Sequence, residues 1–503
     1  MSESSYRTIL RSSSIIGGAQ AINVLANLVR MKVLALLLGP VGVGLAGLYL
    51  SLIQTGSTVA AFGLGTAGTR QIAAANGESD DAAIGLVRRA LFWGTAGLAL
   101  AGGAIFWAAR YWIADYALGD PARGEEVGWL AIGVALTVAA GSQSALLTGL
   151  RRIGDLARLQ VFSGVAGSLF GVLAVWAWGT DGLIAMVLIA PLVAFLMGHI
   201  YVTRLPKITG SRPRIRDLFG ELKALGVLGF AIMGSALATV LGQLIVRVMV
   251  QRELGEDALG HFQAAWAISV TYLGFVLNAM GTDYFPRLSA VIEDREAARR
   301  MVNEQTEVAL LLASPFVIAL LGLAPLVIRI LYSSEFLPAV AVLQWQLLGD
   351  ILKVISWPLG FVLLAAGSGK TFILAETIGV GFMVAGVAFC LPLLGIEATG
   401  AAFVAMYIAY LPITYWLCAR KIGFRWTKPV LLQGVGVIGL AVLVILAAQW
   451  SDLLGSVVAL ASAGALGLWA LVRISTMTQI GGARLARLAS MGERVKAWMT
   501  KLS

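Results

Sequence analysis

Four polar side chains lie along one face of the first apolar segment of the chain. Their spacing of i, i+3, i+7 and i+10 places them on one side of an α-helix. They are Gln20, Asn23, Asn27 and Arg30. Unpaired amides and charges are costly in lipid, so this face is expected to point into protein or into a water-filled cavity. A guanidinium there could grip phosphate oxygens in a bidentate manner and would stay charged at any relevant pH.

A second apolar segment, near the middle of the chain, repeats this arrangement. Its polar residues are four apart and again end in an arginine: Ser235, Thr239, Gln243 and Arg247. Two stripes that end in Arg30 and Arg247 predict a cationic cavity that selects an anionic cargo. The alternative is that the amides and hydroxyls bond between helices while each arginine reaches the outer surface.

A third polar stripe lies in residues 343–360 and contains an acid. It consists of Gln346, Asp350, Lys353 and Trp357. Asp350 and Lys353 are one turn apart, so they could form a structural ion pair or a charge pair that a proton, a sodium ion or the substrate opens. Glu376 is the other acid inside an apolar segment and could join this ion-coupling or gating group. Arg329, also within a span, is predicted to belong with the substrate-binding residues.

The elements that position these stripes are membrane-spanning helices. Of the 503 residues, 59% are hydrophobic and 13% are charged, whereas about a quarter are charged in soluble domains. Apolar runs of about 20 residues predict fourteen spans. Their approximate ranges are 12–37, 43–69, 87–109, 127–149, 158–178, 182–203, 224–250, 259–282, 308–331, 338–365, 371–394, 398–418, 430–449 and 453–472. The N-terminal residues lack a signal-peptide pattern, so the first helix is expected to remain in the protein.

The net charge of +10 follows the predicted topology of these spans. With the N-terminus in the cytoplasm, only Arg110, Arg123 and Arg252 of the 37 Lys and Arg fall in outer loops. This is the positive-inside pattern, and it predicts that both termini are cytoplasmic. It also accounts for the basic segment 204–216 as a topology signal beside anionic lipid, so no nucleic-acid partner is expected.

The two halves of the sequence repeat at a constant offset of 216 residues. Gly39, Gly44, Gly65 and Thr66 fall on Gly255, Gly260, Gly281 and Thr282, and Gly179 falls on Gly395. An even number of helices per repeat gives both copies the same orientation, with a pseudo-twofold axis along the membrane normal. The predicted fold is an all-α polytopic membrane protein with two six-helix lobes and two additional C-terminal helices. The predicted parts are an N-terminal lobe (1–205), a basic linker (206–223), a C-terminal lobe (224–421), helices 13 and 14 (422–475) and a basic tail (476–503).

Several other kinds of chemistry find no support in the sequence. The segment AAGSGKT (365–371) resembles the end of a phosphate-binding loop, but Leu364 stands where that loop needs glycine, so no nucleotide is expected. His199 and His261 have no partner at metal-ligand spacing, so no metal site is predicted. No catalytic residues are predicted, and the protein is not expected to be an enzyme.

Three segments resemble a known family of transporters. Residues 349–376, GDILKVISWPLGFVLLAAGSGKTFILAE, resemble helices ten and eleven of bacterial O-antigen flippases of the Wzx type. Residues 39–55 and 279–289 resemble the second-helix and eighth-helix segments of the same family. These flippases form a branch of the multidrug/oligosaccharidyl-lipid/polysaccharide exporter superfamily. The resemblance implies an inner-membrane flippase that moves an undecaprenyl-diphosphate-linked oligosaccharide to the periplasmic leaflet by alternating access. It also implies a proton or sodium gradient rather than a cofactor, with a polysaccharide polymerase and a chain-length regulator as candidate partners.

Three alternatives remain open at this stage. A lipid II flippase would carry a similar prenyl diphosphate. A multidrug or cation antiporter needs acidic residues in its cavity, and the first and seventh spans contain none. A membrane glycan polymerase or ligase needs a large outer loop with reacting groups, whereas the longest outer loop here is about 110–126.

Overall fold

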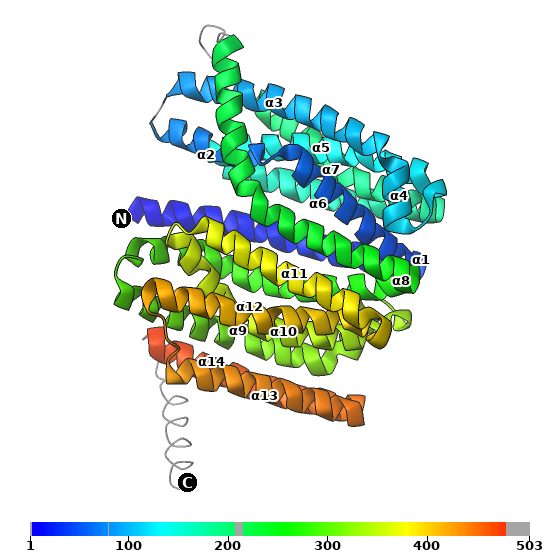
Figure 1. Cartoon of the computed structure of the whole chain (residues 1–503), viewed down its shortest axis with the longest axis vertical. Coiled ribbons are helices and arrows are strands. Elements are labelled where there is room, and N and C mark those ends of the chain that lie inside the picture. Colours follow the sequence, from blue (N-terminus) through cyan, green and yellow to red (C-terminus); the bar gives the residue numbers. More distant parts are fainter. Residues whose placement is uncertain (1–2, 79, 207–214, 479–503) are drawn as a thin grey trace. The chain divides into compact units, whose positions relative to one another are not determined.

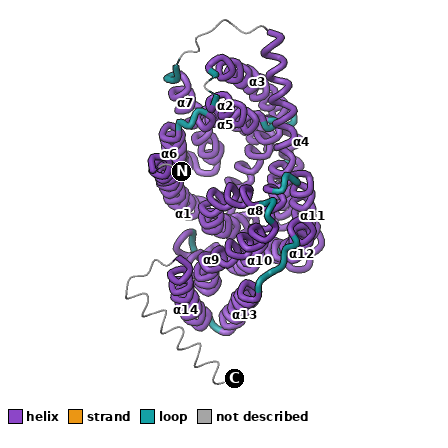
Figure 2. The backbone as a smooth tube through the Cα atoms, turned by 90° about the vertical axis from the view of Figure 1, so that its left-hand side faces the viewer, coloured by secondary structure: helices purple, strands orange, loops and turns teal. Residues whose placement is uncertain are grey.

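The computed structural model describes residues 3–78, 80–206 and 215–478, with the backbone alone for 3–16, 215, 231, 232, 235, 275, 477 and 478. Residues 207–214 of the predicted linker, the tail beyond Thr478 and the side chain of Ser235 therefore lie outside the described residues. Within those ranges the secondary structure is helical, with short connections and no strand (Figure 2). A lipid environment favours this architecture because each helix satisfies its own backbone hydrogen bonds.

The chain divides into two compact units. Unit 1 comprises the chain up to Ala264 together with Leu331–Phe336, and unit 2 comprises Ala265–Ile330 and the chain from Leu337 onward. Unit 1 contains α1 (Glu3–Ala61), α2 (Leu64–Gly77), α3 (Asp81–Ala108), α4 (Arg110–Leu118), η1 (Pro121–Arg123), α5 (Gly124–Gly149), α6 (Ile153–Trp178), η2 (Gly179–Asp181), α7 (Gly182–Thr203), the first part of α8 (Ile215–Val291) and η3 (Ser334–Phe336). Unit 2 contains the rest of α8, then α9 (Arg295–Leu331), α10 (Ala339–Ala365), α11 (Gly369–Leu394), α12 (Glu397–Ile422), α13 (Lys428–Trp450) and α14 (Asp452–Thr478) (Figure 1). The lobe boundaries predicted from the sequence stay predictions.

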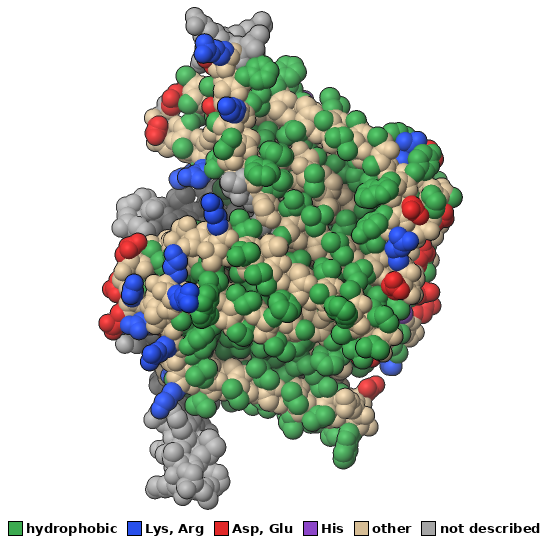
Figure 3. All heavy atoms as spheres, viewed as in Figure 1, with side chains coloured by type: hydrophobic (Ala, Val, Ile, Leu, Met, Phe, Trp, Pro, Cys, Tyr) green, Lys and Arg blue, Asp and Glu red, His purple; other side chains and the backbone are tan. Residues whose placement is uncertain are grey.

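Membrane-length helices account for most of the described chain. Eleven segments are long and apolar enough to cross a membrane. Three of them, of 45, 51 and 56 residues, each contain two helical legs separated by a kink or turn. The described residues thus contain the fourteen membrane-length legs that the sequence predicts, and the polytopic all-α fold is confirmed. On the face in Figure 3, hydrophobic side chains cover the middles of the helices, and Lys, Arg, Asp and Glu gather towards their ends.

The predicted duplication is confirmed by backbone geometry. Gly39 in α1 has φ 62° and ψ −158°, and Gly255 in α8, 216 residues later, has φ 85° and ψ −177°. Each of these glycines separates two helical legs, and an L-side chain rarely adopts such a positive φ. Gly179 and Gly395 form a second matched pair, with φ 59° and 55°. Helices α6 and α11 also begin and end at equivalent positions of the repeat.

One predicted span is interrupted. The span predicted for residues 43–69 breaks at Phe62 and Gly63, which have φ values of 50° and 69° and separate α1 from α2. The first leg of α8 crosses this break closely, since a Cβ placed on Gly63 would lie 2.1 Å from the carbonyl oxygen of Gly229. Two glycines thus allow two backbones to approach, which hydropathy could not reveal. The break lies beside the cavity described next.

Candidate functional site

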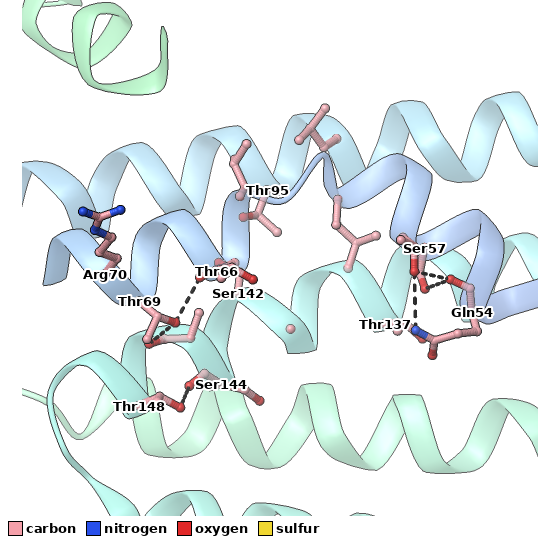
Figure 4. Close-up of a pocket in the computed structure, with 18 of the residues that line it drawn as sticks. Gln54, Ser57, Thr66, Thr69, Arg70, Thr95, Thr137, Ser142, Ser144 and Thr148 are labelled. Atoms are coloured by element: carbon pink, nitrogen blue, oxygen red, sulfur yellow. Dashed lines mark hydrogen bonds between the residues drawn. The ribbon is translucent and has the colours of Figure 1, made fainter. Parts of the chain in front are cut away.

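A cavity of about 620 Å³ in unit 1 is lined by an unusual density of hydroxyl groups. Its walls come from the second leg of α1, α2, α3 and α5 (Figure 4). We call it the hydroxyl pocket, after Ser57, Thr58, Thr66, Thr69, Thr95, Thr137, Ser142, Ser144 and Thr148. Gln54 and Arg70 complete its polar lining, and Figure 4 shows these two at opposite ends of the row.

Helical periodicity explains why these side chains converge. On α1 the lining residues Gln54, Ser57 and Ala61 follow i, i+3 and i+7, and α5 contributes Thr137, Ser144 and Thr148 at i, i+7 and i+11. Each set occupies one face of its helix, and the two faces border the same cavity.

The hydrogen bonds of the hydroxyl groups give the pocket a definite polarity. Thr58 donates to the carbonyl of Gln54 at 2.7 Å, Thr148 to that of Ser144 at 2.7 Å, and Thr69 to that of Gly65 at 3.0 Å. A hydroxyl that donates its proton to its own helix offers only lone pairs to a ligand. At these three positions the wall therefore presents acceptors, which suit the hydroxyl donors of a sugar. Thr95 adds a buried Oγ1 that lacks a hydrogen-bond partner in the described structure.

Charge in the pocket is restricted to its edge. Arg70 is the charged member of the described lining, and its side chain is exposed. The pocket therefore suits a neutral ligand with an anionic group at the Arg70 end.

The predicted stripe of the first span is partly assembled. Arg30 Nη2 donates to Asn27 Oδ1 at 2.6 Å, while its buried Nε has no partner among the described residues. Asn23 packs against α6, where a Cβ on Gly164 would lie 2.0 Å from Asn23 Oδ1. Gln20 is exposed. The lining of the hydroxyl pocket does not include these four residues.

The stripe of the seventh span lies in the first leg of α8. Arg247 is only 5% exposed, and its Nε donates to Gln263 Oε1 at 3.1 Å, across the Gly255 kink. Its Nη1 donates to the backbone carbonyl of Gln243 at 3.1 Å, and Phe262 lies under the guanidinium at 5.8 Å. The Gln243 and Thr239 side chains are half-buried. Arg247 thus ties the two legs of α8 together instead of extending to the surface.

The predicted ion-coupling residues lie in unit 2, and Asp350 is the most unusual of them. Its carboxylate is fully buried on α10 and accepts hydrogen bonds from Ser269 at 2.8 Å and Tyr272 at 3.0 Å, both on α8. Its Oδ1 and both amide atoms of the fully buried Gln346 have no hydrogen-bond partner within the described chain. None of the ion pairs in the described chain joins Asp350 to Lys353. Hydrogen bonds from hydroxyl groups take the place of the structural ion pair considered from the sequence.

The remaining predicted residues are not among the hydrogen-bond partners found for Asp350 in the described structure. Glu376 on α11 accepts a 2.5 Å hydrogen bond from Tyr410 on α12. Lys353 is half-buried, and Arg329 is exposed near the end of α9. Among the described residues, no group of three or more His, Cys, Asp or Glu could hold a metal ion.

The hydroxyl pocket was missed from the sequence, although a signal for it was present. Serine and threonine recur on one face of the second and fourth spans, but hydropathy scores them as nearly neutral within an apolar run. Single hydroxyls usually bond within their own helix, so only the convergence of two such faces identifies a site.

Comparison with known proteins identifies relatives across most of the chain. Residues 33–341 match the family described as polysaccharide biosynthesis protein. The lipid III flippase of Escherichia coli (strain K12) is 25% identical over 412 residues, which cover 80% of this chain and 96% of that protein. The teichuronic acid biosynthesis protein TuaB of Bacillus subtilis is 28% identical over 213 residues, covering 42% of this chain and 43% of that protein.

A solved structure shares the fold. The lipid II flippase MurJ in an inward closed conformation has a TM-score of 0.69 and 14% identity, covering 91% of this chain and 98% of that chain. At this identity the likeness concerns the arrangement of helices alone.

Proposed function

Because the chain belongs to the polysaccharide biosynthesis protein family, we propose that it is a flippase for a lipid-linked oligosaccharide. The cargo would be an undecaprenyl-diphosphate-linked glycan that moves from the cytoplasmic to the periplasmic leaflet of a bacterial inner membrane. The glycan would serve O-antigen, enterobacterial-common-antigen-like or exopolysaccharide biosynthesis, and a polymerase and chain-length regulator would act on it afterwards. The protein would change the position of the cargo and none of its covalent bonds.

The observation that carries this proposal is the hydroxyl pocket. Polar cavities among membrane helices are expensive to maintain and mark the path of a polar substrate. Sugars have many hydroxyl donors, and the acceptor-rich walls around Thr58, Thr69 and Thr148 complement them. Neutral hydroxyl contacts are individually weak, so the same pocket can take up and release a glycan.

The arginine residues supply a complementary argument for a phosphate-bearing cargo. Arg30 has a neutral amide partner, Asn27, and does not belong to the ion pairs of the described chain. Its charge is therefore available to a diphosphate. Arg247, held by Gln243 and Gln263, would keep positive charge inside unit 1.

We also propose that Asp350 binds the coupling ion. A fully buried carboxylate with two hydroxyl donors and a free Oδ1 beside an unpartnered Gln346 amide can accept a proton or hold a sodium ion. Movement of that ion would change the charge of the α8–α10 contact. Such a change is a means of biasing one conformation over another.

The competing functions fit less well. A drug or cation antiporter needs acidic groups facing its cargo, whereas the described lining of the hydroxyl pocket offers hydroxyls, an amide and Arg70. A lipid II flippase would use similar contacts, and complementation of a lipid II flippase deletion would favour it.

The test is transport by the purified protein in proteoliposomes. We expect transfer of an undecaprenyl-diphosphate disaccharide between leaflets without its hydrolysis or polymerisation. Arg30→Ala should abolish this transfer and surface-polysaccharide assembly in cells, with the protein still present in the membrane. Full transport by both Arg30→Ala and Arg247→Ala would contradict the assigned phosphate contacts, and polymerised product would contradict the proposal as a whole.

A further inference from the structure

A second cavity in unit 1 has the opposite chemistry to the hydroxyl pocket. It is a groove of about 760 Å³ between the second leg of α1, α3, α4 and the first leg of α8. Its walls are almost entirely apolar and include Phe62, Ile105, Trp112 and Leu241. Ile105 and Trp112 are 69% and 68% exposed, so the groove opens at the surface that faces lipid. We call it the apolar groove.

One helical leg separates the two cavities. Gln54, Ser57 and Ala61 of α1 line the hydroxyl pocket, whereas Leu52 and Val59 line the apolar groove. Residues two apart on a helix point about 160° from each other, so these sets occupy nearly opposite faces of the leg. The two cavities therefore lie back to back across a single helix.

The two cavities also share one lining residue. Leu98 of α3 lines both of them. A ligand with a polar and an apolar part could therefore occupy both cavities at once by passing beside this residue.

The apolar face of α8 completes the groove. Leu241, Leu244 and Val248 line it at i, i+3 and i+7. Gln243 and Arg247 lie on a different face of the same leg. The arginine and glutamine of this leg therefore do not line the groove, and its occupant has to be a hydrocarbon.

We propose that the apolar groove holds the prenyl tail of the cargo while the hydroxyl pocket holds its glycan, an inference that rests on the proposed function. The lining combines aromatic rings at Phe62, Phe106 and Trp112 with small side chains at Ala60 and Ala101, a surface that suits a methyl-branched, unsaturated chain. The predicted topology places Arg70 at the inner end of its helix and Trp112 at the outer side. In this orientation the head of the cargo would lie towards the cytoplasm, and its tail would extend towards the outer half of the bilayer.

The experiment compares two cargoes with the same diphosphate disaccharide, one on an undecaprenyl chain and one on a farnesyl chain. Ala101→Phe adds a ring inside the groove, and the matched control Ala104→Phe adds the same ring to an exposed alanine of α3 that does not line either cavity. Transport would be measured with the full-length chain in proteoliposomes. We expect Ala101→Phe to slow the undecaprenyl cargo by about tenfold, since lost burial of a few methylenes suffices, and to leave the farnesyl cargo within about twofold of wild type. Ala104→Phe should change neither rate.

The farnesyl cargo also reports whether each variant is folded. The inference would be overturned if Ala101→Phe slowed both cargoes equally or slowed neither. The apolar groove would then be filled by acyl chains of the bilayer. Failure of the wild-type protein to move either cargo would instead overturn the proposed function. Slowing of the undecaprenyl cargo by Ala101→Phe but not by Ala104→Phe, with the farnesyl cargo unaffected, supports the assignment of the prenyl tail to the apolar groove.

Discussion

Helices α5 and α10 occupy equivalent positions in the repeat, but the buried side chains at their centres are apolar in α5 and polar in α10. The 216-residue offset places Leu130 and Val134 of α5 on Gln346 and Asp350 of α10, and all four are fully buried. Two positions that hold hydrocarbon side chains in unit 1 therefore hold an amide and a carboxylate in unit 2.

The helices that face these positions have diverged in the same way. In unit 2, Ser269 and Tyr272 donate hydrogen bonds to Asp350. The equivalent positions in unit 1 are Ile53 and Gly56, and a Cβ on Gly56 would lie 2.9 Å from Val134 Cγ2. The same helix contact is thus a dry, close-packed junction in unit 1 and a buried polar cluster in unit 2.

Further along the two helices, the polar side chains belong to α5 and the apolar residues to α10. The hydroxyl pocket uses Ser142, Ser144 and Thr148 of α5, whereas α10 has Pro358, Gly360 and Leu364 at the equivalent positions. One copy therefore has an open site with many weak contacts, and the other has a closed site with one charge. Under the proposed function, cargo recognition would therefore belong to unit 1 and ion binding to unit 2.

The largest effect is expected when an aspartate equivalent to Asp350 of unit 2 is introduced into unit 1. Val134→Asp would bury a carboxylate where Ile53 and Gly56 stand in place of the donors Ser269 and Tyr272, and an uncompensated buried charge costs at least about 3 kcal/mol. We expect loss of folded protein, measured as membrane yield and as the melting temperature in detergent. Val134→Leu is the size control. A Val134→Asp protein as stable as wild type would show that the two junctions differ less than their packing indicates.

The next effect tests the carboxylate in unit 2. Asp350→Asn keeps the shape and the hydroxyl neighbours but removes the charge, so we expect stable protein whose gradient-driven transport falls by about a hundredfold. The measurement is the rate of cargo transfer with and without a proton or sodium gradient. Asp452→Asn, at an exposed acid, is the matched control. Unchanged gradient dependence in Asp350→Asn would remove the ion-binding role.

The sequence was sufficient for the fold because its main determinants are local. Apolar run length predicts spans, and glycines that recur at 216 residues predicted the repeat that the φ values of Gly39 and Gly255 confirm. The break at Gly63 escaped prediction because it depends on the close approach of Gly229, a contact between residues far apart in the sequence. Charge alone identified Asp350 as unusual, yet its hydroxyl partners belong to another helix.

The candidate site was harder to predict because its residues are individually ordinary. Arg30 and Arg247 attracted attention as charges in lipid, but their roles in transport stay predictions. The hydroxyl pocket depends on four helical segments whose faces converge, and a serine or threonine in a membrane helix gives no sign of what it faces. Side-chain direction around the helix is readable from a sequence, whereas the identity of the neighbouring helix is not.

A smaller effect is expected from the charged edge of the hydroxyl pocket. Arg70→Gln removes a charge-assisted contact with the anionic part of the cargo, and such contacts are worth about 1.5 kcal/mol, so KM should rise by about tenfold with little change in kcat. Arg70→Lys keeps the charge but loses the planar fork and should recover part of the difference. Equal KM values for wild type and Arg70→Gln would exclude Arg70 as a second phosphate contact beside Arg30.

The smallest effect separates the hydroxyl pocket from the many hydroxyls that only satisfy their own helix. Thr58 and Thr271 have the same local bond, to the carbonyls of Gln54 at 2.7 Å and Ala267 at 2.6 Å, but only Thr58 lines the pocket. Replacing either by valine removes a similar bond from an otherwise similar helix, so their effects on stability should match. Because a neutral hydrogen bond contributes about 0.5–1.5 kcal/mol, Thr58→Val should weaken glycan transport about threefold while Thr271→Val leaves it unchanged. Equal transport by the two variants, measured at a cargo concentration below KM, would mean that the sugar does not contact this wall. A threefold difference would instead assign the acceptor surface of unit 1 to the glycan, since the two threonines share the same bond to their own helix and only Thr58 lines the pocket.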